Sequence, residues 1–178
     1  MPHTQDAITV FTIGHSTRPL EEFLSLLEAR EIGLLADVRT IPKSRHNPQF
    51  NGEALAAGLK DHDIQYVHMR GLGGLRRPRK DSTNTAWENA SFRGFADYME
   101  TGEFEKSLIE LLETAKKQRT ALMCAEAVPW RCHRSLIADA LAVRRITVVH
   151  IMSKTSLKEH AMTPWAVATG ERIAYPKA

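Results

Sequence analysis

The chain has 178 residues, of which 43% are hydrophobic and 25% charged, a composition typical of one soluble globular domain over residues 1–178. Its apolar runs are far shorter than the roughly 20 residues that span a bilayer, so we expect a cytoplasmic protein without membrane partners. The net charge of +3 is too small to indicate a nucleic-acid-binding protein by itself. The 2 cysteines are more typical of thiols or reactive groups than of a structural disulfide.

The first predicted strand is a β-branched and aromatic run over residues 8–13 that ends at Gly14. His15 and Ser16 come directly after it. A helix over residues 19–30 should follow, because hydroxyl residues can cap its start and acidic residues suit the positive end of its dipole.

The second predicted strand covers residues 33–38, with Asp37 and Arg39 as polar residues at its end. An irregular loop over residues 42–48 follows, because its prolines oppose both helix formation and strand pairing. This loop carries Arg45.

A helix over residues 52–61 leads to a third strand over residues 64–68. The next loop, residues 70–89, is longer than an ordinary connection and is therefore expected to be functional or mobile. Its first part, residues 70–80, begins at Arg70 and contains basic and glycine residues without an acid, which indicates an anionic partner or a solvated surface.

The remaining chain continues the alternation of helices and strands. The predicted elements are helices over residues 92–101 and 103–118, a strand over 120–124, a helix that ends near 144 and a strand over 146–151. Beyond residue 153 the signals weaken, and we expect a peripheral C-terminal extension whose residues 154–162 form a short helix.

This alternation predicts an α/β fold, a three-layer sandwich around a mostly parallel, five-stranded, Rossmann-like sheet. We expect the strand order 3-2-1-4-5. In such sheets ligands bind outside the carboxyl ends of the strands, where the polar residues that follow each strand would meet. The predicted crevice lies between the loops after the first and fourth strands, with loop 70–80 able to close above it. Its predicted lining is Ser16, Asp37, Arg39, Glu126, His133 and Arg134.

The densest polar segment is residues 124–134, which hold both cysteines, a carboxylate, an imidazole and two guanidinium groups. Helix N-termini and arginines both favour anions, so this edge is a candidate anion site. The residues expected to bind the anion are His15, Ser16, Arg39, Arg45, Arg70 and Arg134. In the alternative interpretation, Arg39 and Arg134 pair with Asp37 and Glu126 in a purely structural network.

The residues of the cluster suggest three kinds of chemistry, which are acid–base catalysis, a reactive thiolate and metal binding. Asp37, Glu126 and His133 are candidates for acid–base catalysis. Cys132, near a helix N-terminus and Arg134, is the better candidate than Cys124 for a reactive thiolate, although free cysteines are often simply buried. Seven residues separate the cysteines, which is poor spacing for zinc, so no metal is expected. The segment after the first strand lacks the Gly-x-Gly-x-x-Gly pattern, so no dinucleotide or other cofactor is expected.

A set of short motifs occurs in order along the chain. They are Gly14-His15-Ser16, Asp37-Val38-Arg39, Leu72-Gly73-Gly74, Cys124-Ala125-Glu126 and Cys132-His133-Arg134. In this combination the chain resembles the domain-of-unknown-function family 488 over about residues 10–152. The resemblance implies a compact α/β protein and supplies no established activity.

Two functions follow from these observations. The first is an enzyme acting on a phosphorylated or otherwise anionic small molecule, nucleotides included, at the carboxyl edge of the sheet. The alternative is a nucleic-acid-binding module that contacts phosphates through the basic residues 70–80.

Overall fold

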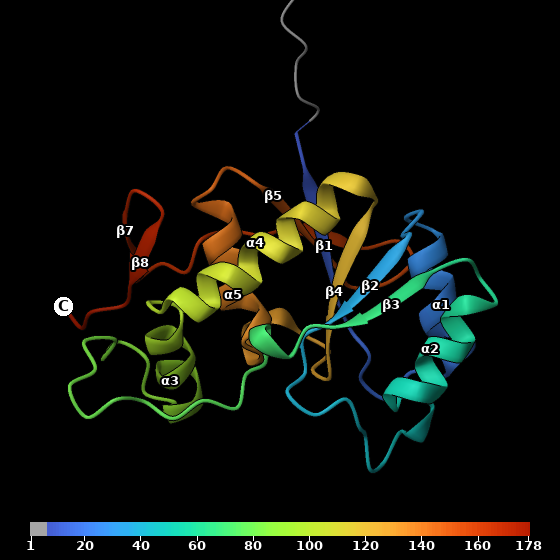
Figure 1. Cartoon of the computed structure of the whole chain (residues 1–178), viewed down its shortest axis with the longest axis horizontal. Coiled ribbons are helices and arrows are strands. Elements are labelled where there is room, and N and C mark those ends of the chain that lie inside the picture. The colour runs from blue at the N-terminus through green and yellow to red at the C-terminus, as the bar shows by residue number, and fades with distance from the viewer. Residues whose placement is uncertain (1–6) are drawn as a thin grey trace, which may run out of the picture.

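The computed structural model describes residues 7–178, which form a central sheet with helices on both sides (Figure 1). The strands of the main sheet are β1 (Thr9–Gly14), β2 (Leu34–Asp37), β3 (Gln65–His68), β4 (Thr120–Cys124), β5 (Thr147–Ile151) and β6 (Leu157–Glu159). The helices are α1 (Leu20–Glu28), α2 (Gly52–Lys60), α3 (Ala90–Tyr98), α4 (Gly102–Lys117) and α5 (Arg134–Ala142). A separate hairpin pairs β7 (Val167–Thr169) with β8 (Arg172–Ala174).

The predicted α/β sandwich is confirmed, but the predicted strand order is wrong in one respect. The sheet has six strands in the order β3-β2-β4-β1-β5-β6, so that β4 lies between β2 and β1. Strands β1 to β5 are parallel, and β6 pairs with β5 in the antiparallel direction. The first crossover, through α1, therefore passes over one strand position that β4 fills later in the chain.

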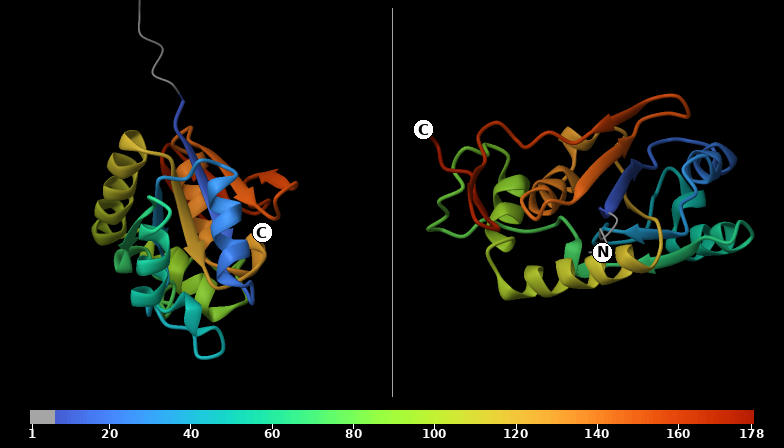
Figure 2. Two further views of the ribbon diagram at one scale, coloured as in Figure 1. Left: turned by 90° about the vertical axis from the view of Figure 1, so that its right-hand side faces the viewer. Right: turned by 90° about the horizontal axis from the view of Figure 1, so that it is seen from above.

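Two hydrophobic cores lie on opposite faces of the sheet. Neighbouring strand residues point to opposite faces, so Val10 packs with α3, α4 and α5, whereas Phe11 packs with α1 and α2. Figure 2 shows α4 and α1 on either side of the sheet. Because both faces are covered, the central strand β4 is buried along its whole length.

Helix α5 determines where the polar cluster lies. Its residues from Arg134 to Leu141 are all buried, so it is a core helix without an exposed face. It begins at Arg134, directly after the turn that follows β4. The first residue of the helix is therefore a buried cation at the carboxyl edge of the sheet.

The C-terminal segment differs from its prediction. Residues 157–159 form the strand β6 and not a helix. The last part of the segment is also not peripheral, because the side chain of Tyr175 is fully buried in the core formed by α3, α4 and α5. Within residues 7–178, no helix has the length and apolar character needed to cross a membrane.

Candidate active site

The ends of three neighbouring strands form the base of the candidate site. Gly14 of β1 lies opposite Cys124 of β4, and Asp37 of β2 lies opposite Met123. Pairing continues past the end of β1, since the His15 backbone N–H donates to the Cys124 carbonyl at 2.9 Å. The Ser16 N–H likewise donates to the Ala125 carbonyl at 3.0 Å. The loops after β1 and β4 are thus joined to each other, whereas the sequence predicted a crevice between them.

Asp37 and Arg39 form a closed ion pair at the end of β2. Arg39 donates through Nε to Oδ1 at 2.9 Å and through Nη2 to Oδ2 at 2.7 Å. The Tyr66 hydroxyl donates to the same carboxylate at 2.6 Å, and Arg39 Nη2 also donates to the Phe50 carbonyl at 2.8 Å. Burial and the Asp37 carboxylate raise the pKa of Tyr66. For Arg39 this arrangement matches the structural alternative, because the carboxylate neutralises its charge.

His15 is a neutral, buried companion of this pair. Its ring stacks on Phe50 with centroids 4.4 Å apart, and its Nδ1–H donates to the Ser16 carbonyl at 2.8 Å. Nε2 is then left to accept from Arg39 Nη1 at 3.4 Å. Burial, with a smaller effect from the Arg39 charge, lowers the pKa of His15. The neutral His15 ring holds Arg39 in position, and it supplies no positive charge that would attract an anion.

Arg134 has a different environment. Its side chain is 0% exposed and reaches back beneath the loop after β4. Nη1 donates to the Cys124 sulfur at 2.8 Å and to the Glu126 carbonyl at 2.7 Å, and Nη2 donates to the Ala127 carbonyl at 3.3 Å. Its Nε has no hydrogen-bond partner. Among the salt bridges of residues 7–178, none joins Arg134 to a carboxylate.

The two cysteines are free thiols with opposite acidities. Burial opposes ionisation of Cys124, but a hydrogen bond from Cys132, the Arg134 charge and the Glu126 backbone lower its pKa to about 7. Burial and the hydrogen bond to Cys124 raise the pKa of Cys132 well above its usual value. The prediction that Cys132 is the better thiolate is therefore wrong. The guanidinium of Arg134 lies against the end of β4, and only its backbone N–H contacts Cys132, at 3.5 Å.

His133 is also neutral, and its tautomer is fixed by two carbonyl groups. Nε2–H donates to the Val38 carbonyl at 2.9 Å and to the Leu72 carbonyl at 3.0 Å. Burial is the main reason that the pKa of His133 falls to about 4. The lone pair on Nδ1 consequently faces the Cys132 sulfur at 3.5 Å.

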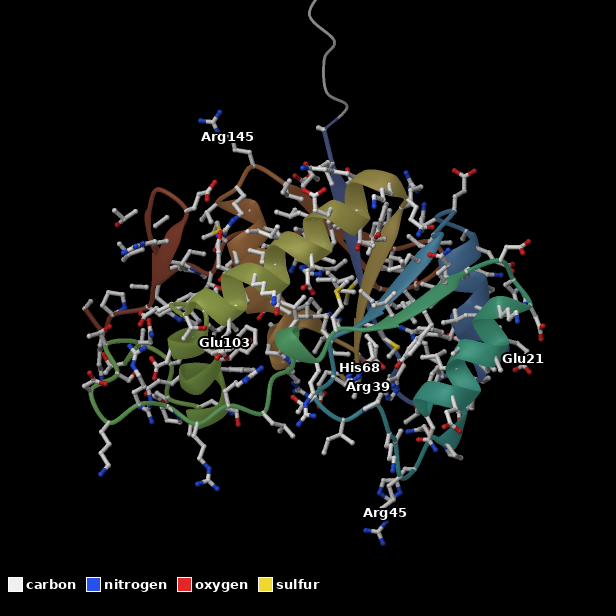
Figure 3. All side chains as sticks on the ribbon, viewed as in Figure 1. Glu21, Arg39, Arg45, His68, Glu103 and Arg145 are labelled. Carbon is white, nitrogen blue, oxygen red and sulfur yellow. The ribbon has the colours of Figure 1, made fainter. Side chains whose placement is uncertain are left out.

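The other predicted site residues lie further out. Glu126 turns its carbonyl towards Arg134 and leaves its side chain exposed, while Ser16 is partly exposed with a φ of 49°. Arg45 and Arg70 are exposed. Figure 3 shows Arg39 at the strand ends and Arg45 extending away from them into solvent. The structure therefore places Arg39 with Asp37 and His15, and Cys132 with His133 and Arg134, while the side chains of Glu126, Arg45 and Arg70 are exposed.

Gly14 is required by the close approach of the loop after β4. A Cβ atom at this position would lie 1.7 Å from the Glu126 carbonyl oxygen and 2.9 Å from Arg134 Nη1. No side chain larger than hydrogen fits there without displacing backbone. Gly14 thus allows the loop to fold down onto the buried guanidinium.

The second half of the basic loop after β3 packs against α3. Asp97 of α3 accepts hydrogen bonds from the Arg79 backbone at 2.8 Å and from the Ser82 hydroxyl at 2.7 Å. Asn84 donates to the same carboxylate at 2.7 Å, and the Arg76 guanidinium lies 3.6 Å from the centre of the Tyr98 ring. These contacts fix residues 76–84 against α3.

A buried polar network beside the site was missed by the sequence analysis. It runs from Thr12 to His150 at 2.5 Å, from His150 to His160 at 2.9 Å, and from His160 to Asp139 at 2.8 Å. The Tyr175 hydroxyl also donates to Asp139, at 2.8 Å. Burial is the first cause that lowers the pKa of His150 to about 3, followed by His160. Polar residues within predicted buried elements, such as Thr12 and Asp139, were the available signal.

Two cavities border the β7–β8 hairpin and not the carboxyl edge. One of about 490 Å³ is lined by Trp165 and the C-terminal residues, and one of about 1020 Å³ lies between the hairpin, α4 and the end of α5. Within the described residues, no cluster of three or more His, Cys, Asp or Glu side chains is arranged to hold a metal ion.

Comparison with known proteins places most of the chain in one family. The family model described as "Domain of unknown function DUF488" matches residues 19–141. The match extends from just before α1 almost to the end of α5 and so includes the cysteines, His133 and Arg134. Comparisons with curated proteins and with solved structures gave no match.

Proposed function

Because the chain belongs to the DUF488 family, whose function is unknown, we propose its function from the site itself. The protein is an enzyme that acts on an anionic substrate, and the Cys124 thiolate is its nucleophile. The observation that carries this proposal is the fully buried Arg134, 2.8 Å from the Cys124 sulfur and in no described salt bridge with a carboxylate. An uncompensated buried charge costs several kcal/mol, so the surroundings favour a negatively charged sulfur.

The acidity of Cys124 suits this role. With a pKa of about 7, roughly half of its thiol is ionised at neutral pH. A thiolate stabilised by a neighbouring cationic side chain is a common nucleophile of cysteine enzymes. Such free thiols persist in a reducing compartment, in keeping with the cytoplasmic location predicted from the sequence.

The charge of the surrounding surface supports an anionic substrate. Several cations on the loops after β2, β3 and β4 are exposed and take part in no salt bridge among residues 7–178. They are Lys43, Arg45, Arg70, Arg77, Lys80 and Arg131. Exposed cations without carboxylate partners raise the local concentration of anionic ligands.

The reaction that fits is group transfer through a covalent cysteine intermediate. The Cys124 sulfur attacks the phosphorus or carbonyl carbon of an anionic ester, the alcohol leaves with a proton, and water later releases the bound group. The Glu126 side chain is exposed and lies outside the cluster, so it can exchange protons with the leaving group and with water only once the loop after β4 moves. Since Cys124 is buried, the loop over residues 125–131 must move to admit the substrate.

The test compares the wild type with Cys124→Ser and Cys132→Ser on p-nitrophenyl phosphate and nucleoside monophosphates. We expect turnover to fall by at least about a hundredfold in Cys124→Ser, with a covalent adduct on Cys124 detected by mass spectrometry in the wild type. Equal turnover in Cys124→Ser and the wild type would refute the proposal. An Arg131→Ala variant, which alters the surface but not the nucleophile, should raise KM more than it lowers kcat.

A second candidate function, nucleic-acid binding, is favoured by a different observation. Large apolar side chains are exposed among these cations, with Ile41 at 58%, Leu75 at 71% and Trp130 at 55%. Cations that follow a phosphate backbone, together with an exposed aromatic ring for stacking, are typical of proteins that bind single-stranded nucleic acids.

Binding to single-stranded RNA and DNA across a salt series tests this candidate. The variants are Arg70→Ala, Arg77→Ala and Lys80→Ala, because Arg76 and Arg79 already have partners within the protein. Each should reduce the salt slope by up to about 1, whereas Lys106→Ala on α4 should leave it unchanged. An affinity that does not change with salt would exclude the nucleic-acid function.

A further inference from the structure

The sulfur atoms of Cys124 and Cys132 both contact Arg134. Arg134 contacts both, with Nη1 at 2.8 Å from the Cys124 sulfur and its backbone N at 3.5 Å from the Cys132 sulfur. Cys132 also lies close enough to Cys124 to help lower the pKa of that thiol. Both side chains belong to the same buried cluster, and they are the only 2 cysteines of the chain. Each is therefore the only possible partner of the other for a disulfide within the chain.

We propose that this pair is an oxidation site for hydroperoxides, which convert Cys124 and Cys132 into an intramolecular disulfide. The inference goes beyond the proposed function, because it requires neither an anionic substrate nor turnover. The two cysteines have different roles in it, since the Arg134 guanidinium contacts one sulfur and not the other.

Cys124 is the attacking sulfur. Its short contact with a buried cation that lacks a carboxylate holds it as the thiolate, the form that reacts with peroxides. Its lowered pKa agrees with this assignment. Cys132 stays protonated beside it and acts as the resolving thiol.

The two steps balance as follows. The Cys124 thiolate attacks one peroxide oxygen, the O–O bond breaks, and the departing alkoxide or hydroxide takes a proton from solvent, which leaves Cys124 as a sulfenic acid. The Cys132 sulfur then attacks the Cys124 sulfur, and the sulfenic hydroxyl leaves as water with the thiol proton. Two thiols are oxidised to one disulfide, and the hydroperoxide is reduced to an alcohol and water.

His133 is placed to assist the second step. Both acceptor carbonyls of the ring lie on the Nε2 side, so the Nδ1 lone pair faces the Cys132 sulfur at 3.5 Å. It can accept a hydrogen bond from the Cys132 thiol and so hold this sulfur in place for the attack. His133 is thus a positioning residue for the resolving thiol.

The experiment treats the folded, full-length protein with hydrogen peroxide and cumene hydroperoxide. We expect the wild type to become two hydrogen atoms lighter, to lose both thiols, to remain monomeric on a non-reducing gel and to recover with a dithiol reductant. Cys132→Ser should stop at a sulfenic acid on Cys124 that a dimedone reagent traps. Cys124→Ser should leave Cys132 at least about tenfold less reactive at the same peroxide concentration.

Opposite results would overturn the proposal. They are equal reactivity of the two single variants, a disulfide between chains, or oxidation of the wild type only in denaturant. If a serine variant does not fold, differential alkylation of the wild type followed by peptide mapping identifies which cysteine reacts first. His133→Asn should slow disulfide formation without slowing trapping of the sulfenic acid, a difference that a merely structural role would not produce. Because no anionic ester is present, these results do not depend on whether the proposed turnover exists.

Discussion

Two arginines at the carboxyl edge of the sheet are both buried, and their environments are opposite. Arg39 is held by both oxygens of Asp37, with Tyr66 and Phe50 completing the arrangement. Arg134 is held by backbone carbonyls and one sulfur, with one nitrogen left without a partner. The comparison teaches that burial of a guanidinium does not by itself mark a functional site. What distinguishes Arg134 is the missing carboxylate, which leaves its charge to act on Cys124.

The largest expected loss of stability comes from breaking the ion pair between Asp37 and Arg39. Asp37→Asn leaves the Arg39 charge buried without compensation, so we expect the free energy of unfolding to fall by about 3–5 kcal/mol. Urea denaturation measures this change. Glu22→Gln, which breaks the exposed pair with Arg18, is the matched control and should cost less than about 1 kcal/mol. A loss of similar size in both variants would contradict the structural role of the Asp37–Arg39 pair.

A lower pH should reduce the stability of the protein through His133, the residue before Arg134. The pKa of this imidazole is about 4 in the folded protein, below the ordinary 6.5, so between these values the unfolded chain binds the extra proton. Stability should therefore fall as the pH drops from about 6.5 to 4, by roughly 3 kcal/mol from this group. Urea denaturation at several pH values tests it, and His133→Asn should show a shallower pH dependence than the wild type.

A methyl group at Gly14, beneath the loop after β4, should cause a smaller loss of stability. Gly14→Ala forces the Glu126 carbonyl and Arg134 apart, so we expect a destabilisation of at least about 1–3 kcal/mol. Gly102→Ala is the matched control, because no atom lies within 4 Å of a Cβ at that position. Thermal unfolding of both variants provides the measurement, and equal midpoints would mean that the loop does not need this contact.

The smallest expected change in free energy comes from Arg134→Lys, which tests the contacts of the Arg134 guanidinium. In Arg134→Lys the ammonium cannot retain the same set of contacts, so the pKa of Cys124 should rise from about 7. A rise of one unit or more slows alkylation of Cys124 by iodoacetamide at pH 7 by about five- to tenfold or more, as followed by peptide mass mapping. Arg39→Lys changes the other buried guanidinium and should leave this rate unchanged. If the two variants behave alike, the two arginines do not differ as described.

The sequence predicted the elements better than their arrangement. Apolar periodicity located the strands and helices, because each is amphipathic or buried along its length. It could not reveal that β4 inserts between β1 and β2, because periodicity reports burial and not the identity of the pairing strand. In the same way, a strand of three exposed residues such as β6 has no apolar pattern to detect.

The cluster of polar residues lies at the carboxyl edge of the sheet, but the contacts of its arginine differ from those that the sequence suggested. Cys132 is close to Arg134 in the sequence, which favoured it as the thiolate. The long side chain of Arg134 instead extends past it to Cys124, a reach that residue spacing does not encode. The Asp37–Arg39 pair was among the alternatives, because the two residues are separated by only one position.

The central position of β1 has a consequence for how the chain folds during synthesis. Both partners of this strand, β4 and β5, are made more than a hundred residues after it. Contacts between such distant segments slow folding, and an apolar strand without its neighbours is prone to aggregate. In the nascent chain β2 and β3 can therefore pair with each other before β1 has a partner strand. The step that completes the sheet is the same one that brings Gly14 against Cys124.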